Sequence, residues 1–241
     1  MAQGAHAFDA ETSIPTISAQ CWGSLLHGGP ADAHKVTNEI ACNEEYPEDS
    51  EYPSFMKVVR QQLGPAVVLG SYVCWGPINF GLIEKSAKCE CFVKPDDQLV
   101  DYICDYISLK KPKVLFVQFD DVDHAGHTYG YGTEEYYKQI NKTDAHIGKI
   151  IDKIKAEGIF EKSLIIITSD HGGGGDDEKS HGSSCDCDKL IFWTCCGENI
   201  KKNFKIEEKM NILDTALVVT EALGIEAPMS FQGKLPQSMY I

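Results

Sequence analysis

Two short apolar segments, separated by a long amphipathic one, constrain the fold of this chain more than any other feature. Residues 113–119 (KVLFVQF) and 163–168 (SLIIIT) are apolar at consecutive positions, which is typical of strands buried on both faces. Between them, residues 133–157 carry isoleucines at helical spacing, including Ile147 and Ile151. Strand, long helix and strand in this order predict a βαβ unit, and therefore a mostly parallel central sheet flanked by helices on both faces.

The remaining patterns continue this alternation of strands and helices. Further helices are predicted at 52–63, 96–109 and 211–223, and further strands at 66–73 and 190–196. At a length of 241 residues, the chain is expected to form a single α/β domain that spans residues 1–241.

Charge and composition exclude several classes of protein. Lys and Arg total 22 against 36 Asp and Glu, a net charge of −14, so nucleic-acid binding through a basic surface is excluded. No apolar run reaches the roughly 18 residues that a membrane-spanning helix needs. Ten cysteines in 241 residues are too few for a disulfide scaffold, and residues 1–6 lack the features of a secretory signal. A cytoplasmic protein with reduced thiols is therefore expected, and the oligomeric state stays open.

Potential metal ligands follow both of the predicted core strands. Residues 120–127 (DDVDHAGH) come directly after the first strand and residues 169–175 (SDHGGGG) after the second, with residues 179–182 (KSHG) close behind. Because ligands of open α/β sheets bind at the carboxyl ends of the strands, these segments are expected to converge there. Carboxylate and imidazole together favour Zn²⁺, with Mn²⁺ and Mg²⁺ as alternatives, and there are enough of them for two adjacent divalent ions. Taken singly, each residue is equally well explained as part of a loop.

A fourth segment, residues 15–28 (PTISAQCWGSLLHG), places Ser18 at the start of a short predicted helix that Gly28 ends. One interpretation is that Ser18 is an N-cap residue. The other is a nucleophile at a helix N-terminus, where free N–H groups and the helix dipole favour a bound phosphate. The tyrosine-rich residues 129–137 either line the same pocket or pack against the fold.

Together, PTIS (15–18), Asn38, DxxxH (123–127), SDHGG (169–173) and KSHG (179–182) resemble the alkaline phosphatase superfamily, in its type I phosphodiesterase/nucleotide pyrophosphatase branch. The resemblance covers about residues 13–233 and implies an alkaline-phosphatase-like fold. It implies that Ser18 is the nucleophile and that Asn38 helps to hold the phosphate oxygens. The implied ligands are Asp123, His127 and His181 for one metal ion, and Asp170, His171 and Ser18 for the other.

The family begins with an apolar strand that ends in Asp-Gly, and its Asp binds the second metal. Residues 1–8 (MAQGAHAF) do not match such a strand. Asp9 is the only aspartate before Ser18, and it is expected to lie outside any strand and not to take the role. The fold is therefore expected to lack the first strand of the family, and the second metal to lack one anionic ligand.

The resemblance implies a metal-dependent phosphoesterase that hydrolyses phosphodiester or nucleotide pyrophosphate bonds through a phospho-serine intermediate. Its expected substrate is a small phosphate ester or a nucleotide. One alternative is a truncated or catalytically crippled member that keeps the fold and one metal. Another is a phosphomonoesterase or phosphotransferase that uses the same site. A sulfatase is excluded because Ser18 is followed by Ala19-Gln20-Cys21 and not by the x-Pro-x-Arg of the sulfatase signature.

Overall fold

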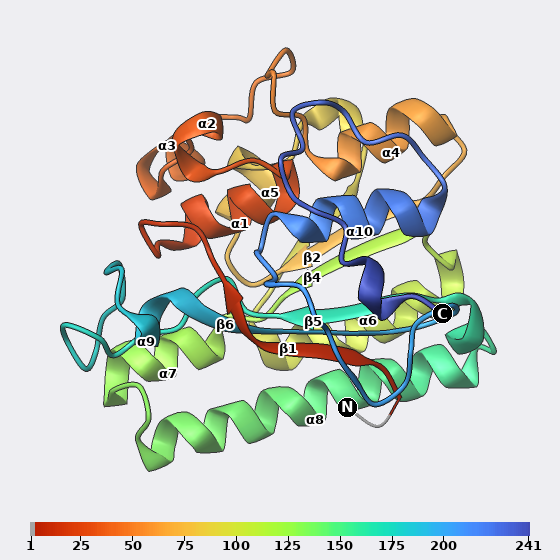
Figure 1. The fold of residues 1–241 in the computed structure, drawn as a ribbon. Coiled ribbons are helices and arrows are strands. Elements are labelled where there is room, and N and C mark those ends of the chain that lie inside the picture. Colours follow the sequence, from red (N-terminus) through yellow and green to blue (C-terminus); the bar gives the residue numbers. More distant parts are fainter. Residues whose placement is uncertain (1–2) are drawn as a thin grey trace.

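A computed structural model describes residues 3–241, and its strands form two separate sheets (Figure 1). The smaller sheet has three strands in the order β3-β2-β4, and both of its pairings are parallel. These strands are β2 (Leu69–Val73), β3 (Glu90–Val93) and β4 (Val114–Gln118). This sheet contains the predicted strands at 66–73 and 113–119, each shortened at its ends.

The larger sheet has four strands in the order β5-β6-β1-β7. Its strands are β1 (Ala5–Glu11), β5 (Ile165–Thr168), β6 (Leu190–Cys196) and β7 (Phe204–Lys205). Strand β6 runs antiparallel to both β5 and β1, whereas β1 and β7 are parallel. The complete set of pairings is therefore mixed, because parallel pairing dominates only in the smaller sheet.

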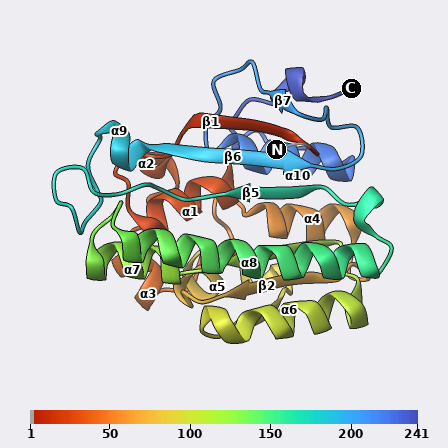
Figure 2. The same ribbon diagram turned by 90° about the horizontal axis from the view of Figure 1, so that it is seen from below.

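Helices cover both faces of the sheets, which confirms the predicted α/β class. Figures 1 and 2 show α6 (Asp96–Lys110), α7 (Asp121–Tyr129) and α8 (Glu134–Ala156) on one face. The opposite face carries α1 (Ser18–His27), α4 (Phe55–Leu63) and α10 (Asp214–Leu223). The short helices are α2 (Ala31–His34), α3 (Asn38–Asn43), α5 (Pro77–Gly81) and α9 (Asp186–Lys189). No helix within residues 3–241 is long and apolar enough to cross a bilayer.

The predicted helices form where the sequence supplies caps and an apolar stripe. Helix α8 begins after Thr133, whose Oγ1 accepts a hydrogen bond from Tyr136 N at 3.3 Å. Helix α4 begins in the same way after Ser54, whose hydroxyl accepts from Lys57 N at 3.2 Å. Helix α10 ends where Gly224 adopts the left-handed conformation, at φ 64°.

Two apolar cores lie between these layers. The larger core includes Trp193 and Ile212, both completely buried, and it joins β1 and β6 to α1, α4 and α10. The smaller core lies between α6, β2 and α8 and is centred on Leu99 and Ile103, which are also completely buried. Burying one such aliphatic side chain stabilises the fold by about 1.5–3 kcal/mol, so these layers fix the positions of the strand ends.

Strand β1 contradicts the expectation that residues before Ser18 form no strand. Asp9 lies within this strand, and its side chain is exposed. The inward-facing residues of β1 include only small apolar side chains, Ala5, Ala7 and Ala10, which are buried against the larger core. Alanines at the buried positions give only a weak strand signal in the sequence. The segment forms a strand because its backbone pairs with that of β6.

Strands β4 and β5 are less buried than their apolar sequences predict. Every residue of β5 is only half-buried, as are Val114, Leu115 and Val117 of β4. The physical reason is that each strand pairs on one side only within residues 3–241: β4 with β2, and β5 with β6.

Candidate metal centre and nucleophile

The predicted ligands Asp123 and His127 lie on α7, which begins just after β4 ends. Their spacing of four residues places both side chains on one face of the helix. A buried carboxylate holds the start of this helix: Asp96 accepts hydrogen bonds from the backbone N–H groups of Asp120 (3.0 Å) and Asp121 (2.9 Å). The residues that the sequence placed in a ligand loop are therefore helical, and their helix is capped by a distant side chain.

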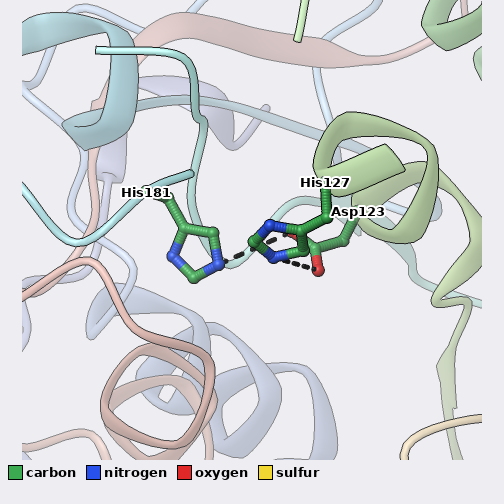
Figure 3. A group of neighbouring side chains, drawn as sticks. All are labelled: Asp123, His127 and His181. Carbon is green, nitrogen blue, oxygen red and sulfur yellow. Dashed lines mark ion pairs between the residues drawn. The ribbon is translucent and has the colours of Figure 1, made fainter. Parts of the chain in front are cut away.

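Asp123, His127 and His181 form the first cluster (Figure 3). Each offers one ligand atom, and these atoms all lie within 4.8 Å of one another. His127 Nε2 is 3.2 Å from Asp123 Oδ2, and His181 Nε2 is 3.7 Å from Asp123 Oδ1. The structure therefore brings together the three residues predicted to hold one metal ion.

Both histidines of the first cluster are oriented by main-chain carbonyl groups. His127 Nδ1 lies 2.7 Å from the carbonyl oxygen of Lys179, and His181 Nδ1 lies 2.6 Å from that of Thr16. Because a carbonyl oxygen can only accept, each Nδ1 carries the proton and each Nε2 lone pair is free to bind a metal. Burial lowers the pKa of His181, which keeps this ring neutral. This donor set fits a divalent ion, and the two carbonyl partners belong to no sequence motif.

The second cluster consists of Asp170, His171 and Ser18. His171 Nε2 lies 3.3 Å from Asp170 Oδ2 and 3.3 Å from Ser18 Oγ. His171 Nδ1 donates to the carbonyl oxygen of Gly172 at 2.8 Å, so the same tautomer rule applies. Burial raises the pKa of Asp170 to about 6. This cluster also fits a divalent ion, with one carboxylate, one imidazole and one hydroxyl as its donors.

The two clusters are neighbours. The rings of His171 and His181 are stacked, with centroids 3.8 Å apart and an interplanar angle of 23°. Since one ring belongs to each cluster, two ions held by these residues would lie close together, as the sequence predicts.

Ser18 is the first residue of α1 and does not cap it. The N-cap residue is Ile17, whose own side chain makes no capping hydrogen bond. Asn38 begins α3, where its Oδ1 accepts a hydrogen bond from Ala19 N at 2.9 Å. This bond leaves the Asn38 NH₂ group free for another partner, next to the Ser18 hydroxyl. Of the two interpretations of Ser18, the structure therefore contradicts the N-cap role.

Both clusters border one cleft with a volume of about 230 Å³. Its lining includes all but one of the predicted site residues: Ser18, Asn38, Asp123, His127, Asp170 and His181. The exception, His171, is buried behind them. The remaining wall consists of Trp22, Trp75, Gln118, Phe119 and Asp120. Sequence reasoning missed Trp22 and Trp75, which come from separate parts of the chain and belong to no motif.

Comparisons with known proteins agree with this arrangement. Residues 79–181 match the family described as type I phosphodiesterase / nucleotide pyrophosphatase. The bovine (Bos taurus) bis(5'-adenosyl)-triphosphatase ENPP4 is 33% identical over 72 residues. This alignment covers 29% of the chain and only 16% of that relative, so the chain aligns with a small part of the relative's length.

Solved structures share the fold across the whole chain. Murine ectonucleotide pyrophosphatase / phosphodiesterase 5 superposes with a TM-score of 0.77 and 13% identity, over 100% of this chain and 92% of that one. A putative sulfatase from Bacteroides fragilis gives a TM-score of 0.74 and 15% identity, over 99% of this chain and 71% of that one. The matched family segment includes both Asp/His pairs and His181. Residues 79–181 are thus similar to the type I phosphodiesterase / nucleotide pyrophosphatase family, and the chain as a whole has the fold of these solved structures.

Proposed function

We propose that this protein is a metal-dependent phosphoesterase that hydrolyses phosphodiester or nucleotide pyrophosphate bonds. The observation that carries the proposal is the convergence of two Asp/His clusters on one cleft, with the Ser18 hydroxyl 3.3 Å from His171 Nε2 of the second. The first cluster would hold one divalent ion, and Asp170 and His171 would hold the second beside Ser18. Zn²⁺ suits this mixture of carboxylate and imidazole ligands best, with Mn²⁺ and Mg²⁺ as alternatives.

Divalent ions bound there would lower the pKa of the Ser18 hydroxyl and neutralise charge on the phosphoryl group. Ser18 Oγ attacks the phosphorus atom, the bond from phosphorus to the leaving oxygen breaks, and a phospho-serine forms. Water then attacks this phospho-serine, releases phosphate or a phosphomonoester, and regenerates the hydroxyl. The proposed chemistry is therefore two successive displacements at phosphorus.

Two features of the chain stabilise charge on the transferred group. The Asn38 NH₂ group donates to an equatorial phosphate oxygen, because its Oδ1 is already fixed by Ala19 N. The N-terminus of α1, where Ser18 lies, directs its positive dipole end at the same oxygens. Both features act before any ion is bound and orient the phosphate for attack.

A nucleotide or another small phosphate ester is the proposed substrate. One matching relative is named a bis(5'-adenosyl)-triphosphatase, and an inactive form of murine phosphodiesterase 5 was solved in complex with AMP. The tryptophan-containing wall of the cleft offers flat apolar surface to such a leaving group. We also propose a cytoplasmic location, supported by ten free cysteines.

A catalytically crippled protein is the second candidate function. The specific observation in its favour is that the second cluster consists of one carboxylate, one imidazole and the Ser18 hydroxyl, one anionic ligand fewer than the resemblance implies. Such a protein would bind one ion tightly and turn over phosphodiesters slowly or not at all.

A hydrolysis assay distinguishes the active phosphoesterase from the crippled protein. The purified protein is assayed on bis-(p-nitrophenyl) phosphate and on p-nitrophenyl phosphate, with and without added Zn²⁺. We expect Zn²⁺-dependent turnover of the diester that Ser18→Ala abolishes. Ser86→Ala, which changes an exposed serine away from the cleft, serves as the control and should leave turnover unchanged. Undiminished hydrolysis by Ser18→Ala would contradict the nucleophilic role. Binding of one ion without turnover would favour the crippled protein.

A further inference from the structure

Tyr131 lies where α7 and the glycine-rich segment 172–175 meet, although it belongs to neither of the ligand motifs. Its hydroxyl donates a hydrogen bond to Asp123 Oδ1 at 2.5 Å. Its backbone N–H donates to the carbonyl oxygen of Glu178 at 2.9 Å. Tyr131 is thereby attached on one side to a proposed metal ligand and on the other to the segment that leads to His181.

The ring of Tyr131 occupies space that glycines leave open. A Cβ atom on Gly126 or Gly173 would lie 2.5 Å from ring atoms of Tyr131, and one on Gly174 would lie 3.0 Å from its side chain. Such distances below 3 Å are incompatible with a side chain unless the ring moves. Gly126 of α7 and Gly173 of the glycine-rich segment therefore share one requirement, which is close packing on a single tyrosine ring.

The same ring stands beside both histidines of the first cluster. Its centroid is 6.0 Å from that of His127 and 6.5 Å from that of His181, with interplanar angles of 78° and 86°. These edge-on contacts limit how far either imidazole can swing. One side chain thus contacts all three residues of the first cluster.

We propose that Tyr131 is a positioning residue of the metal centre, which holds the Asp123 carboxylate in the orientation that binds an ion. Asp123 Oδ1 accepts from the phenol, whereas Oδ2 is the oxygen nearest to His127 Nε2. A phenol bonded to one carboxylate oxygen fixes the rotation of the whole group about its Cβ–Cγ bond. This role rests on the proposed metal-dependent function, because it concerns the same ligands.

Tyr131→Phe tests the role, since it removes the hydroxyl and keeps the ring that packs on the glycines. Hydrogen bonds to metal-ligating groups typically change metal affinity 10–100-fold when they are removed. We therefore expect the Kd for Co²⁺, followed by its visible absorption spectrum, to rise by about 10–100-fold in this variant. The melting temperature of the metal-free protein should change little, because packing is retained.

Tyr136→Phe is the matched control. The Tyr136 ring lies 5.4 Å from that of Tyr131, and its hydroxyl makes no hydrogen bond within residues 3–241. We expect this variant to bind Co²⁺ with the affinity and spectrum of the wild-type protein. If Tyr131→Phe did the same, the positioning role would be wrong while the metal centre remained.

A second variant tests the position of the Tyr131 ring and leaves the hydroxyl group on it. Gly173→Ala must displace the Tyr131 ring and should weaken Co²⁺ binding, whereas Gly148→Ala, with no atom within 4 Å of the added Cβ, should not. Combined with Tyr131→Phe, Gly173→Ala should have a smaller effect than alone, because the displaced hydroxyl is already gone. Fully additive effects would contradict the proposal. Failure of the wild-type protein to bind Co²⁺ would instead overturn the proposed function, and this role with it.

Discussion

The two ligand clusters of the cleft are held by different means. In the first cluster, two ligands share one face of α7 and the third returns from the segment after the glycines, and both histidines are fixed by carbonyl groups. In the second cluster, a half-buried aspartate and a buried histidine follow β5, which pairs on one side only within residues 3–241. Each cluster has one carboxylate. The Tyr131 hydroxyl orients Asp123 in the first cluster, whereas burial raises the pKa of Asp170 in the second and disfavours its charge.

The geometry of the two clusters therefore depends on the tertiary fold to different degrees. Helical spacing brings Asp123 and His127 together locally, and His181 joins them from the segment that follows β5. The second cluster requires β5, the start of α1 and the cleft wall to meet, and its carboxylate has a raised pKa because it is buried. We therefore expect the first cluster to bind its ion more tightly and to be the less sensitive of the two to changes elsewhere.

Loss of a first-cluster ligand should have the largest effect. A structural Zn²⁺ site contributes about 10–16 kcal/mol, or roughly 3 kcal/mol for each of about four ligands, which corresponds to about 100-fold in affinity. His127→Ala should therefore weaken Zn²⁺ binding at the tight site at least about 100-fold and abolish phosphodiester hydrolysis. Isothermal titration calorimetry with Zn²⁺ measures the affinity.

The control for this variant is His124→Ala, which removes an exposed histidine from the same helix. It should bind Zn²⁺ as the wild-type protein does. Equal losses of Zn²⁺ affinity in the two variants would indicate damage to α7. The result would then say nothing about a difference between the two clusters.

Asp170→Asn should separate stability from function in the second cluster. Because the pKa of Asp170 is raised to about 6 in the folded chain, its ionised form destabilises the metal-free protein above that pH. Taking an unfolded value near 3.9, the variant should gain up to about 3 kcal/mol in free energy of unfolding at pH 8. The gain should shrink as the pH falls through about 6 and vanish below about 4, where Asp170 is protonated in both states.

Urea unfolding of the metal-free protein between pH 4 and pH 8 measures this gain, with Asp9→Asn as the control at an exposed aspartate. Asp170→Asn should also lose phosphodiester hydrolysis. A variant less stable than the wild-type protein at pH 8 would show that the Asp170 charge is compensated by groups other than a metal.

Thr16→Val should have the smallest effect, and only on the first cluster. The Thr16 hydroxyl donates to the carbonyl oxygen of Ser183 at 2.8 Å and accepts from Gly182 N at 2.9 Å, which fixes the segment around His181. Loss of these bonds should lower the free energy of unfolding by about 1–3 kcal/mol and weaken Zn²⁺ binding by about 10-fold.

Thr220→Val, at a buried threonine of α10, provides the comparison, because its hydroxyl bonds only within that helix. It should change stability without changing Zn²⁺ affinity. An unchanged Zn²⁺ affinity in Thr16→Val would mean that this segment does not position His181.

Strong periodic signals made most of the fold predictable from sequence, and weak ones did not. The long isoleucine stripe gave α8, and the apolar runs gave β4 and β5. Strand β1 was missed because its buried residues are alanines. Helix α7 was missed because its only buried residues, Ala125 and Gly126, are too small to give an apolar stripe. The half-burial of β4 and β5 depends on which strands pair, and sequence periodicity does not contain that information.

The candidate site was predictable to the extent that its residues form motifs. Ser18, Asn38 and every predicted metal ligand meet around one cleft, because strand ends and helix starts bring short motifs together. The groups that orient them were not predictable. Carbonyl groups such as those of Thr16 and Lys179 exist at every position, and only tertiary structure selects the ones that accept from a histidine. Tyr131 and Asp96 lie outside the motifs that they support.

Anomalous diffraction at the zinc edge, from crystals grown with Zn²⁺, tests the central claim most directly. We predict one strong peak bound by Asp123, His127 and His181, at about 2.0–2.2 Å from their oxygen and nitrogen atoms. A second, weaker peak should lie beside Asp170 and His171, within reach of Ser18 Oγ. Zinc found only elsewhere, for example at Cys185 and Cys187, with both clusters empty, would contradict a metal-dependent phosphoesterase built on this cleft.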